Sequence, residues 1–379
     1  MGNAMRRNIV NPFICNGYEG PLYFCDREKE TEELCSTLKN GRNITLVSPR
    51  RMGKTGLIWH TFHHIRSTNR DAVCVYLDIF PTKNQSEFVR MLGEAIATEA
   101  FTKGMLLKKK AMELLAALRP VLGMDPMTGT PVVSLNVDAT PSEANLRSIF
   151  GFLNKLQREV YVAIDEFQQV ASYPEPGTEA LLRSFMQFSQ NVHFIFSGSR
   201  QHLMTEMFVS PQRPFYQSTE LMHLSPLDEE AYYQFANSFF EKRQGGFDRQ
   251  LFHDLYAAFD GYTWYIQTLL NRLYEHFRSV SKSEQLGTTL SAVVESKSAY
   301  YESLMQFLTG NQFSLLRAIA KEERVVQPMG KKFVGKYRLP SNSSILAALK
   351  VLEEKELIYK QKDGYMVYDR FLNLWLKRL

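Results

Sequence analysis

The stretch that decides the fold runs from residue 43 to residue 56 and reads NITLVSPRRMGKTG. Residues 43–47 are mainly β-branched and apolar without alternation, which is typical of a strand buried on both faces. After a turn, Ile58, Phe62 and Ile65 recur at spacings of four and three residues, which predicts an apolar stripe along a helix. The stretch therefore indicates a buried strand that leads through a tight turn into a helix.

Three later segments have the same strand-like composition. They are residues 73–79 (VCVYLDI), 160–164 (VYVAI) and 193–197 (HFIFS), and helical patterns stand between them. Strand and helix in repeated alternation predict an α/β fold with a mainly parallel sheet. After residue 224 the strand signals stop and a helical block follows, with the polar residues 279–289 as a candidate linker.

The composition bounds the class of protein. A length of 379 residues predicts two or three domains, and 44% hydrophobic with 22% charged residues excludes global disorder. No apolar run is long enough to span a membrane, and the N-terminus lacks the apolar stretch of a secretory signal. We expect a soluble, cytoplasmic protein. The cysteines show no C-x-x-C spacing, so neither a zinc site nor a disulfide framework is predicted.

The turn after the first strand carries a recognisable chemistry. It comprises Ser48, Pro49, Arg50, Arg51, Met52, Gly53, Lys54, Thr55 and Gly56. A P-loop needs a strand, a turn whose N–H groups surround phosphate oxygens, a lysine for the terminal phosphates and a hydroxyl for magnesium at a helix start. The turn has these parts in order, with Ser48 in place of the motif's first glycine. Lys54 could instead be solvated, but a cation opposes the helix dipole there, so an anion partner explains it better.

Two carboxylates form a second group. Asp165 and Glu166 directly follow residues 160–164, at the carboxyl end of a predicted parallel strand, where open α/β sheets bind ligands. Asp165 would hold magnesium and Glu166 would polarise the attacking water. Taken alone, the pair also fits solvated loop acids. Combined with the P-loop, it favours nucleotide chemistry.

Two serines follow the next strand segment. Ser197 and Ser199 would stand beside the phosphate loop, where a hydroxyl could sense the terminal phosphate or position the water. Ordinary turn chemistry after a strand is an equal alternative.

With these motifs in view, the chain resembles the archaeal-type ATPase family of prokaryotes, a P-loop group related to STAND and origin-recognition AAA+ ATPases. The resemblance covers most of the chain. It is carried by Asn11-Pro12-Phe13, Phe24-Cys25-Asp26-Arg27-Glu28, Pro49-Arg50-Arg51-Met52-Gly53-Lys54-Thr55, Ile164-Asp165-Glu166-Phe167-Gln168, Phe196-Ser197-Gly198-Ser199, Leu224-Ser225-Pro226-Leu227 and Val367-Tyr368-Asp369-Arg370-Phe371. The paired arginine before M-G-K-T and the D-E-F-Q segment are its more specific parts.

The resemblance implies an adenine pocket and a lid. In it, Phe13, Phe24 and Arg27 would help to enclose the adenine, although such side chains can equally fill a core. A helical lid would carry a G-x-P element near the nucleotide, and this chain has Gly261-Tyr262-Thr263 there, without the proline.

The resemblance also bears on activity and assembly. The resemblance also extends to Trp375-Leu376 near the end of the chain. Larger relatives carry a nuclease domain after this W-L segment, and because this chain ends at Leu379 we expect no nuclease activity. An arginine from a neighbouring copy could complete the site in a homo-oligomer. Arg200 and Arg213 are candidates by position alone, and we assign neither.

The last part of the chain is basic and has its own pattern. Residues 311–379 carry a net charge of +7 within a total of +5, so the remainder is slightly acidic. Two short helical patterns, a helix capped near Ser341 and a hairpin around Asp363-Gly364 predict a winged helix. Lys360 and Lys362 lie where a wing would contact DNA phosphates. The third helix has no arginine for guanine contacts, so protein docking stays open beside DNA binding.

Together these observations predict three domains: a P-loop ATPase domain over residues 1–225, a helical lid and linker over 226–310 and a basic winged helix over 311–379. The expected ligands are ATP or ADP with Mg²⁺, and the expected function is a nucleotide-controlled switch with slow hydrolysis. Two alternatives stay open, a DNA-binding regulator with a structurally bound nucleotide and a protein-docking scaffold. We expect no membrane partner.

Overall fold

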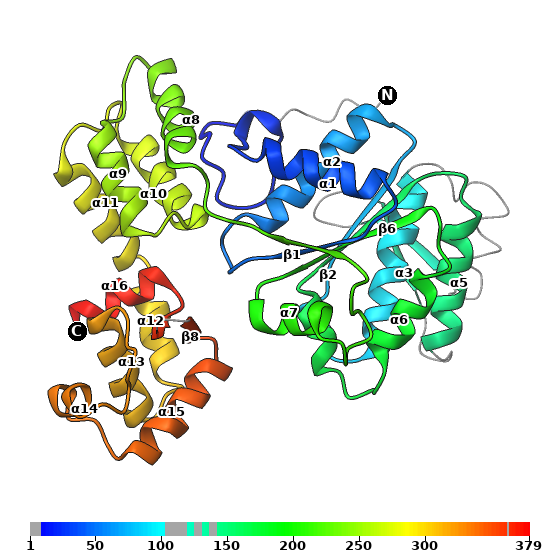
Figure 1. Cartoon of the computed structure of the whole chain (residues 1–379). Coiled ribbons are helices and arrows are strands. Elements are labelled where there is room, and N and C mark those ends of the chain that lie inside the picture. The colour runs from blue at the N-terminus through cyan, green and yellow to red at the C-terminus, as the bar shows by residue number, and fades with distance from the viewer. Residues whose placement is uncertain (1–8, 103–119, 125–130, 136–141, 362–363) are drawn as a thin grey trace. The chain divides into compact units, whose positions relative to one another are not determined.

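The computed structural model describes residues 9–102, 120–124, 131–135, 142–361 and 364–379. Contacts between Cα atoms divide the chain into two compact units (Figure 1). One, the sheet unit, comprises Ile14–Tyr232 and the short segment Tyr262–Trp264. The other, the helical unit, contains Tyr233–Gly261 and Tyr265–Leu379. The three domain boundaries proposed above stay predictions.

The sheet unit is built on five parallel strands. They are β1 (Ile44–Val47), β2 (Val73–Asp78), β5 (Val160–Asp165), β6 (Val192–Gly198) and β7 (Glu220–His223), in the order β2-β5-β6-β1-β7. The predicted α/β fold with a parallel sheet is confirmed. Strand β7 had no sequence signal, because three of its four residues are exposed and it lies at an edge of the sheet.

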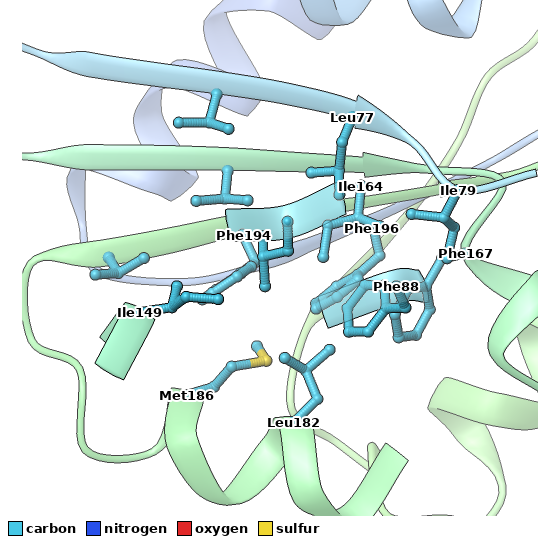
Figure 2. Close-up of a cluster of buried hydrophobic side chains, with 14 of the residues drawn as sticks. Leu77, Ile79, Phe88, Ile149, Ile164, Phe167, Leu182, Met186, Phe194 and Phe196 are labelled. Atoms are coloured by element: carbon cyan, nitrogen blue, oxygen red, sulfur yellow. The ribbon is translucent and has the colours of Figure 1, made fainter. Parts of the chain in front are cut away.

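Helices cover both faces of this sheet, because alternate residues of the buried strands point to opposite sides. On one side α1 (Glu28–Lys39) and α2 (Lys54–Thr68) pack against Cys74, Tyr161 and Ile195. On the other side α3 (Gln85–Thr102), α5 (Ser142–Lys155), α6 (Thr178–Met186) and α7 (Gln201–Val209) enclose the core shown in Figure 2. Because both faces of the sheet are covered by helices, apolar residues follow one another along these strands instead of alternating with polar residues.

Short elements complete the unit. The 3₁₀ helices η1 (Pro21–Tyr23) and η3 (Phe167–Ser172) precede α1 and follow β5. Strands β3 (Pro120–Met124) and β4 (Pro131–Leu135) form an antiparallel hairpin.

The helical unit begins with a block of helices. These are α8 (Glu229–Lys242), of which the first residues belong to the sheet unit, α9 (Arg249–Ala258), α10 (Thr263–His276), α11 (Ser283–Glu295) and α12 (Ser298–Met305). The linker prediction for residues 279–289 is wrong for most of that segment, since α11 begins at Ser283 and buries Thr289. Its polar composition belongs to a helix with one solvated face.

The winged helix follows in the predicted order. Helices α13 (Gly310–Glu322), α14 (Lys331–Tyr337) and α15 (Asn342–Glu354) precede the hairpin β8 (Ile358–Gln361) and β9 (Gly364–Val367), and α16 (Arg370–Arg378) ends the fold. Ser341 caps α15 by accepting a hydrogen bond from the Ser344 N–H at 3.4 Å. Across the described parts of the chain, no helix combines the length and apolarity that crossing a membrane requires.

Candidate nucleotide site

The predicted phosphate loop connects β1, a central strand of the sheet, to helix α2. Arg51 and Gly53 have left-handed backbones with φ of 70° and 94°. Left-handed residues in a loop turn successive N–H groups toward one side, which is how anion-binding nests are built. Gly53 adopts this conformation without strain. Arg51 adopts it at a cost, because its Cβ makes a left-handed backbone unfavourable.

Lys54, at the first position of α2, is buried, with only 6% of its surface exposed. Its Nζ donates to the carbonyl oxygens of Ser48 and Pro49 at 2.9 and 3.1 Å. Burial lowers the pKa of Lys54, while the nearby carboxylates of Glu166 and Asp165 act in the opposite direction. The ammonium group is thus held inside the loop.

The acids predicted to follow β5 lie beside this loop. Asp165 is buried, and its Oδ2 accepts a hydrogen bond from the Thr55 hydroxyl at 2.8 Å. Its Oδ1 accepts from the Glu166 N–H at 3.0 Å. The two groups of residues that the sequence suggested separately are therefore in direct contact, although strand β6 separates β1 from β5.

Tyr76 was missed by the sequence analysis. Its hydroxyl donates to Asp165 Oδ2 at 3.0 Å, the same oxygen that Thr55 contacts, and burial followed by the Asp165 charge raises the pKa of Tyr76. The Trp59 ring packs against the Tyr76 ring, with the two ring centroids 5.1 Å apart. One signal in the sequence could have found it. Tyr76 lies two residues after Cys74 in the same strand, and alternate residues of one strand share a face.

Glu166 has a left-handed backbone, with φ of 54°, and two buried side chains hold its carboxylate. Oε2 accepts from Ser199 Oγ at 2.7 Å and from Gln168 Nε2. The Gln168 amide packs tightly, since a Cβ on Gly198 would lie 2.4 Å from Gln168 Oε1. Of the two predicted serines, Ser199 thus contacts Glu166, and Ser197 is buried with no hydrogen-bond partner for Oγ among the described residues.

A third carboxylate lies at the same edge of the sheet. Asp78 ends β2 in register with Asp165, and its Oδ1 accepts from the Phe80 N–H at 2.9 Å. Although the Asp78 side chain is exposed, partial desolvation at this edge of the sheet raises its pKa, and the charges of Asp165 and Glu166 add to this effect. The edge of the sheet is therefore more acidic than the sequence motifs alone indicated.

The donor set fits a hard divalent cation. Thr55 supplies a hydroxyl and Asp165 a carboxylate, which are ligand types that Mg²⁺ prefers. Within the ranges that the structure describes, no cluster of three or more His, Cys, Asp or Glu side chains could hold a metal ion by itself. A cation here would take its remaining ligands from phosphate oxygens and water, as Mg²⁺ commonly does.

The adenine-pocket candidates lie in different surroundings. Phe24 stacks on His60 with ring centroids 4.4 Å apart, and its ring edge would lie 3.1 Å from a Cβ on Gly56. The hydroxyl of Tyr18 hydrogen-bonds His60 Nδ1 at 2.8 Å. Phe24 is thus part of an aromatic cluster beside the loop residue Gly56.

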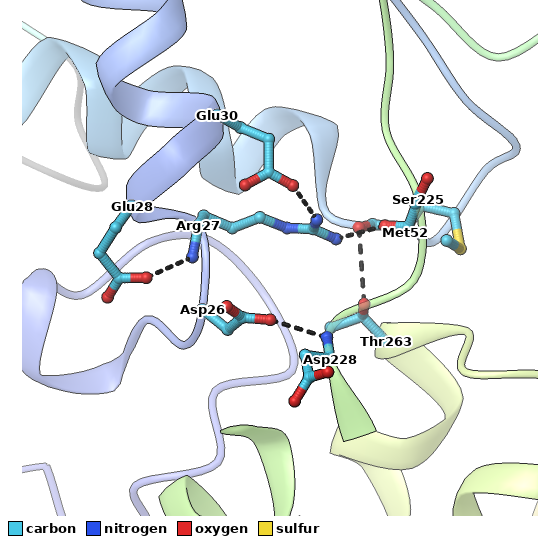
Figure 3. A network of polar contacts seen from close by, with 8 residues as sticks. All are labelled: Asp26, Arg27, Glu28, Glu30, Met52, Ser225, Asp228 and Thr263. Atoms are coloured by element: carbon cyan, nitrogen blue, oxygen red, sulfur yellow. Dashed lines mark hydrogen bonds and ion pairs between the residues drawn. The ribbon is translucent and has the colours of Figure 1, made fainter. Parts of the chain in front are cut away.

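Arg27 and Phe13 have structural partners. Arg27 is buried, ion-paired with Glu30, and its Nη2 donates to the Ser225 carbonyl at 2.7 Å (Figure 3). Phe13 belongs to the helical unit, where it is fully buried and its ring lies 5.5 Å from that of Tyr274. The packing of both favours the core alternative, and their role in an adenine pocket stays a prediction.

Of the two lysines predicted to contact DNA from the winged helix, the structure describes one. Lys360 is exposed on β8, with Nζ 5.5 Å from the Tyr365 ring centroid. Lys362 lies outside the described residues. Of the arginines considered for an oligomeric site, Arg213 pairs with Glu179 at 3.3 Å and Arg200 is exposed before α7.

This geometry, a parallel sheet with a buried loop lysine and acids beside it, defines a P-loop ATPase domain, here with a C-terminal winged helix. The chain belongs to the family described as an ATPase domain predominantly from Archaea, whose model matches residues 24–269. A second model, of a probable winged helix domain, matches residues 299–378. The resemblance drawn from the sequence motifs is confirmed.

Solved structures agree with this fold. A Walker-type ATPase of Pyrococcus abyssi is 18% identical, with a TM-score of 0.67 over 97% of this chain and 100% of that one. The ORC2 protein of Aeropyrum pernix in its ADP form is 14% identical, with a TM-score of 0.57 over 97% and 98%. The ORC1 protein of the same organism, solved in complex with DNA, is 11% identical, with a TM-score of 0.55 over 97% and 96%. None of the curated proteins matches the chain.

Proposed function

We propose that this chain binds ATP with Mg²⁺, hydrolyses it slowly and acts as a nucleotide-controlled switch. The observation that carries the proposal is the hydrogen bond of 2.8 Å between Thr55 and Asp165. It joins the phosphate loop to the acids of β5, so that one metal-bound polyphosphate can contact both. The family supports an adenine nucleotide, and the aromatic cluster around Phe24 offers rings against which a base could stack.

Each residue has a role in this proposal. The loop N–H groups and Lys54 bind the phosphates, and the Thr55 hydroxyl and Asp165 hold the cation. Bound Mg²⁺ would neutralise charge on the transferred phosphoryl group. Glu166, oriented by Ser199 and Gln168, accepts a proton from the attacking water. Ser197 and Ser199 would respond to the terminal phosphate from the end of β6.

Two substitutions test these roles. Lys54→Ala should abolish binding of a fluorescent ATP analogue, because it removes the cation that the loop encloses. Glu166→Gln should keep that binding and stop phosphate release, because an amide does not accept the proton. Hydrolysis by Glu166→Gln at the parental rate would contradict the role assigned to Glu166.

The winged helix is proposed to contact DNA. Its support is the net charge of +7 over residues 311–379 and the exposed Lys360. This net value already counts the acids that pair with two of the lysines, since Lys336 pairs with Glu322 at 2.6 Å and Lys377 pairs with Glu323. Binding of this electrostatic kind should weaken steeply as salt is raised. Failure to bind any DNA at low salt would favour a protein-docking domain instead.

A second candidate function is a DNA-binding regulator whose nucleotide is structural. The observation that favours it is the lid segment, where Thr263 replaces the expected proline. Phosphate release measured with and without DNA separates the two. Release stimulated by DNA supports the switch, whereas tightly retained ADP without release supports the regulator. We also propose that the chain can form a homo-oligomer. Light scattering of the same preparations with each nucleotide measures the mass of the particle and tests this.

A further inference from the structure

A short segment from far along the chain contacts the phosphate loop. Tyr262–Trp264 belongs to the sheet unit, although the residues on either side of it belong to the helical unit. The Trp264 N–H donates to the carbonyl of Arg51 at 3.0 Å. The Thr263 hydroxyl lies 3.5 Å from the carbonyl of Met52, a contact visible in Figure 3. Tyr262 packs against the core beneath α1 and α2.

The Trp264 side chain contacts the same loop residue as its backbone. The guanidinium carbon of Arg51 lies 4.2 Å from the Trp264 ring centroid, which is a cation–π contact. Arg51 is therefore held twice, through its carbonyl and through its guanidinium. The hydrogen bond and the cation–π contact together restrain Arg51 at its unfavourable φ of 70°.

This restraint matters because the loop conformation is not the one that Arg51 would adopt alone. A non-glycine residue keeps a left-handed backbone only where its surroundings hold it there. If Arg51 relaxed to a negative φ, the peptide N–H groups around it would turn away from the side on which the nest faces. The affinity of the loop for phosphate should therefore depend on Trp264.

We propose that Trp264 is a positioning residue of the phosphate loop: it holds Arg51 in the left-handed conformation and thereby preorganises the loop for the phosphates of a nucleotide. The inference rests on the proposed function of this loop. It assigns to an aromatic side chain of the lid segment, which lacks the expected proline, a role in nucleotide affinity. Trp264 contacts the loop and is not proposed to touch the reacting atoms.

The test is a double-mutant cycle on the full chain, with binding of a fluorescent ATP analogue in Mg²⁺ as the readout. Trp264→Ala should weaken binding about tenfold, the scale of one unsupported left-handed residue. Arg51→Gly removes the need for support, because glycine adopts positive φ without strain. In the Arg51→Gly background, Trp264→Ala should therefore change the affinity less than about twofold.

Two further variants keep the result decisive. Trp264→Phe retains an aromatic face for Arg51 and should restore most of the affinity, which a loss of folding would not do. Trp375→Phe, in the winged helix, is the matched tryptophan control and should bind as the parental chain does. Parental affinity in Trp264→Ala, or an equal loss in the Arg51→Gly background, would overturn the proposal. Failure of the parental chain itself to bind nucleotide would overturn the proposed function instead.

Discussion

Gly198 at the end of β6 offers a direct test of how Glu166 is oriented. In Gly198→Ala, the new Cβ would lie 2.4 Å from Gln168 Oε1 and 2.5 Å from Met204 Cγ and Sδ. All of these atoms belong to buried side chains, so one or both must move. Overpacking of this kind costs about 1–3 kcal/mol of folding stability, and methionine is flexible enough to keep the cost in that range.

The larger effect should be on turnover. Displacing the Gln168 amide removes a hydrogen bond to the Glu166 carboxylate, and bonds to a charged group contribute about 1.5–3 kcal/mol. If that energy orients the carboxylate for catalysis, phosphate release should slow about ten- to hundredfold. Affinity for nucleotide should change less, because Lys54 is held by the Ser48 and Pro49 carbonyls and not by Gln168. The Gly198 carbonyl, which accepts from the Ser48 N–H at 3.4 Å, is unchanged by the substitution.

The assay combines steady-state phosphate release, nucleotide titration and thermal unfolding of the same preparations. Gly151→Ala in α5 is the matched control: a Cβ there meets nothing within 4 Å, and alanine favours a helix interior by up to about 1 kcal/mol. Gly198→Ala with parental turnover and a lowered melting temperature would refute the positioning role of Gln168, because the packing would have been disturbed without consequence for the chemistry.

Two further outcomes are expected. Tyr76→Phe removes one of the donors to Asp165 Oδ2 and should shift the Mg²⁺ concentration needed for half-maximal nucleotide binding by severalfold, while binding without metal stays unchanged; equal Mg²⁺ dependence would exclude a role for Tyr76 at the cation. Burial, followed by the charge of His63, lowers the pKa of His60, so the unfolded chain takes up a proton that the folded chain does not. Stability should therefore fall as the pH drops below about 6.5, the usual value for histidine. In urea titrations His60→Asn should lose part of that dependence, and an identical slope in both proteins would contradict this assignment.

The fold was predictable from the sequence where burial dictates composition. Strands β1, β2, β5 and β6 lie between two helical layers, so their residues are apolar without alternation. Strand β7 pairs on one side only, and its exposed residues give no such pattern. The winged helix was predictable because caps and a tight turn mark its elements locally.

The site was predictable only as far as its residues follow one another in the chain. The loop around Lys54 and the acids after Ile164 form contiguous motifs with known chemistry. Tyr76 resembles an ordinary strand residue in the sequence, and only the pairing of β2 with β5 brings it to Asp165. Gln168 lies in the D-E-F-Q segment, but that motif does not show that its amide turns back to the Glu166 carboxylate. Trp264 lies more than two hundred positions from its partner Arg51, a contact that no local pattern encodes.

The order of the strands also decides what joins the two halves of the site. Because β6 lies between β1 and β5, the backbones of the strand that carries the loop and the strand that carries Asp165 are two inter-strand spacings apart, about 10 Å. Side chains alone close that distance, since the Thr55 hydroxyl contacts the Asp165 carboxylate directly. Shortening either side chain, as in Thr55→Ala or Asp165→Ala, would therefore break this direct link between the loop and the acids while leaving the sheet itself unchanged.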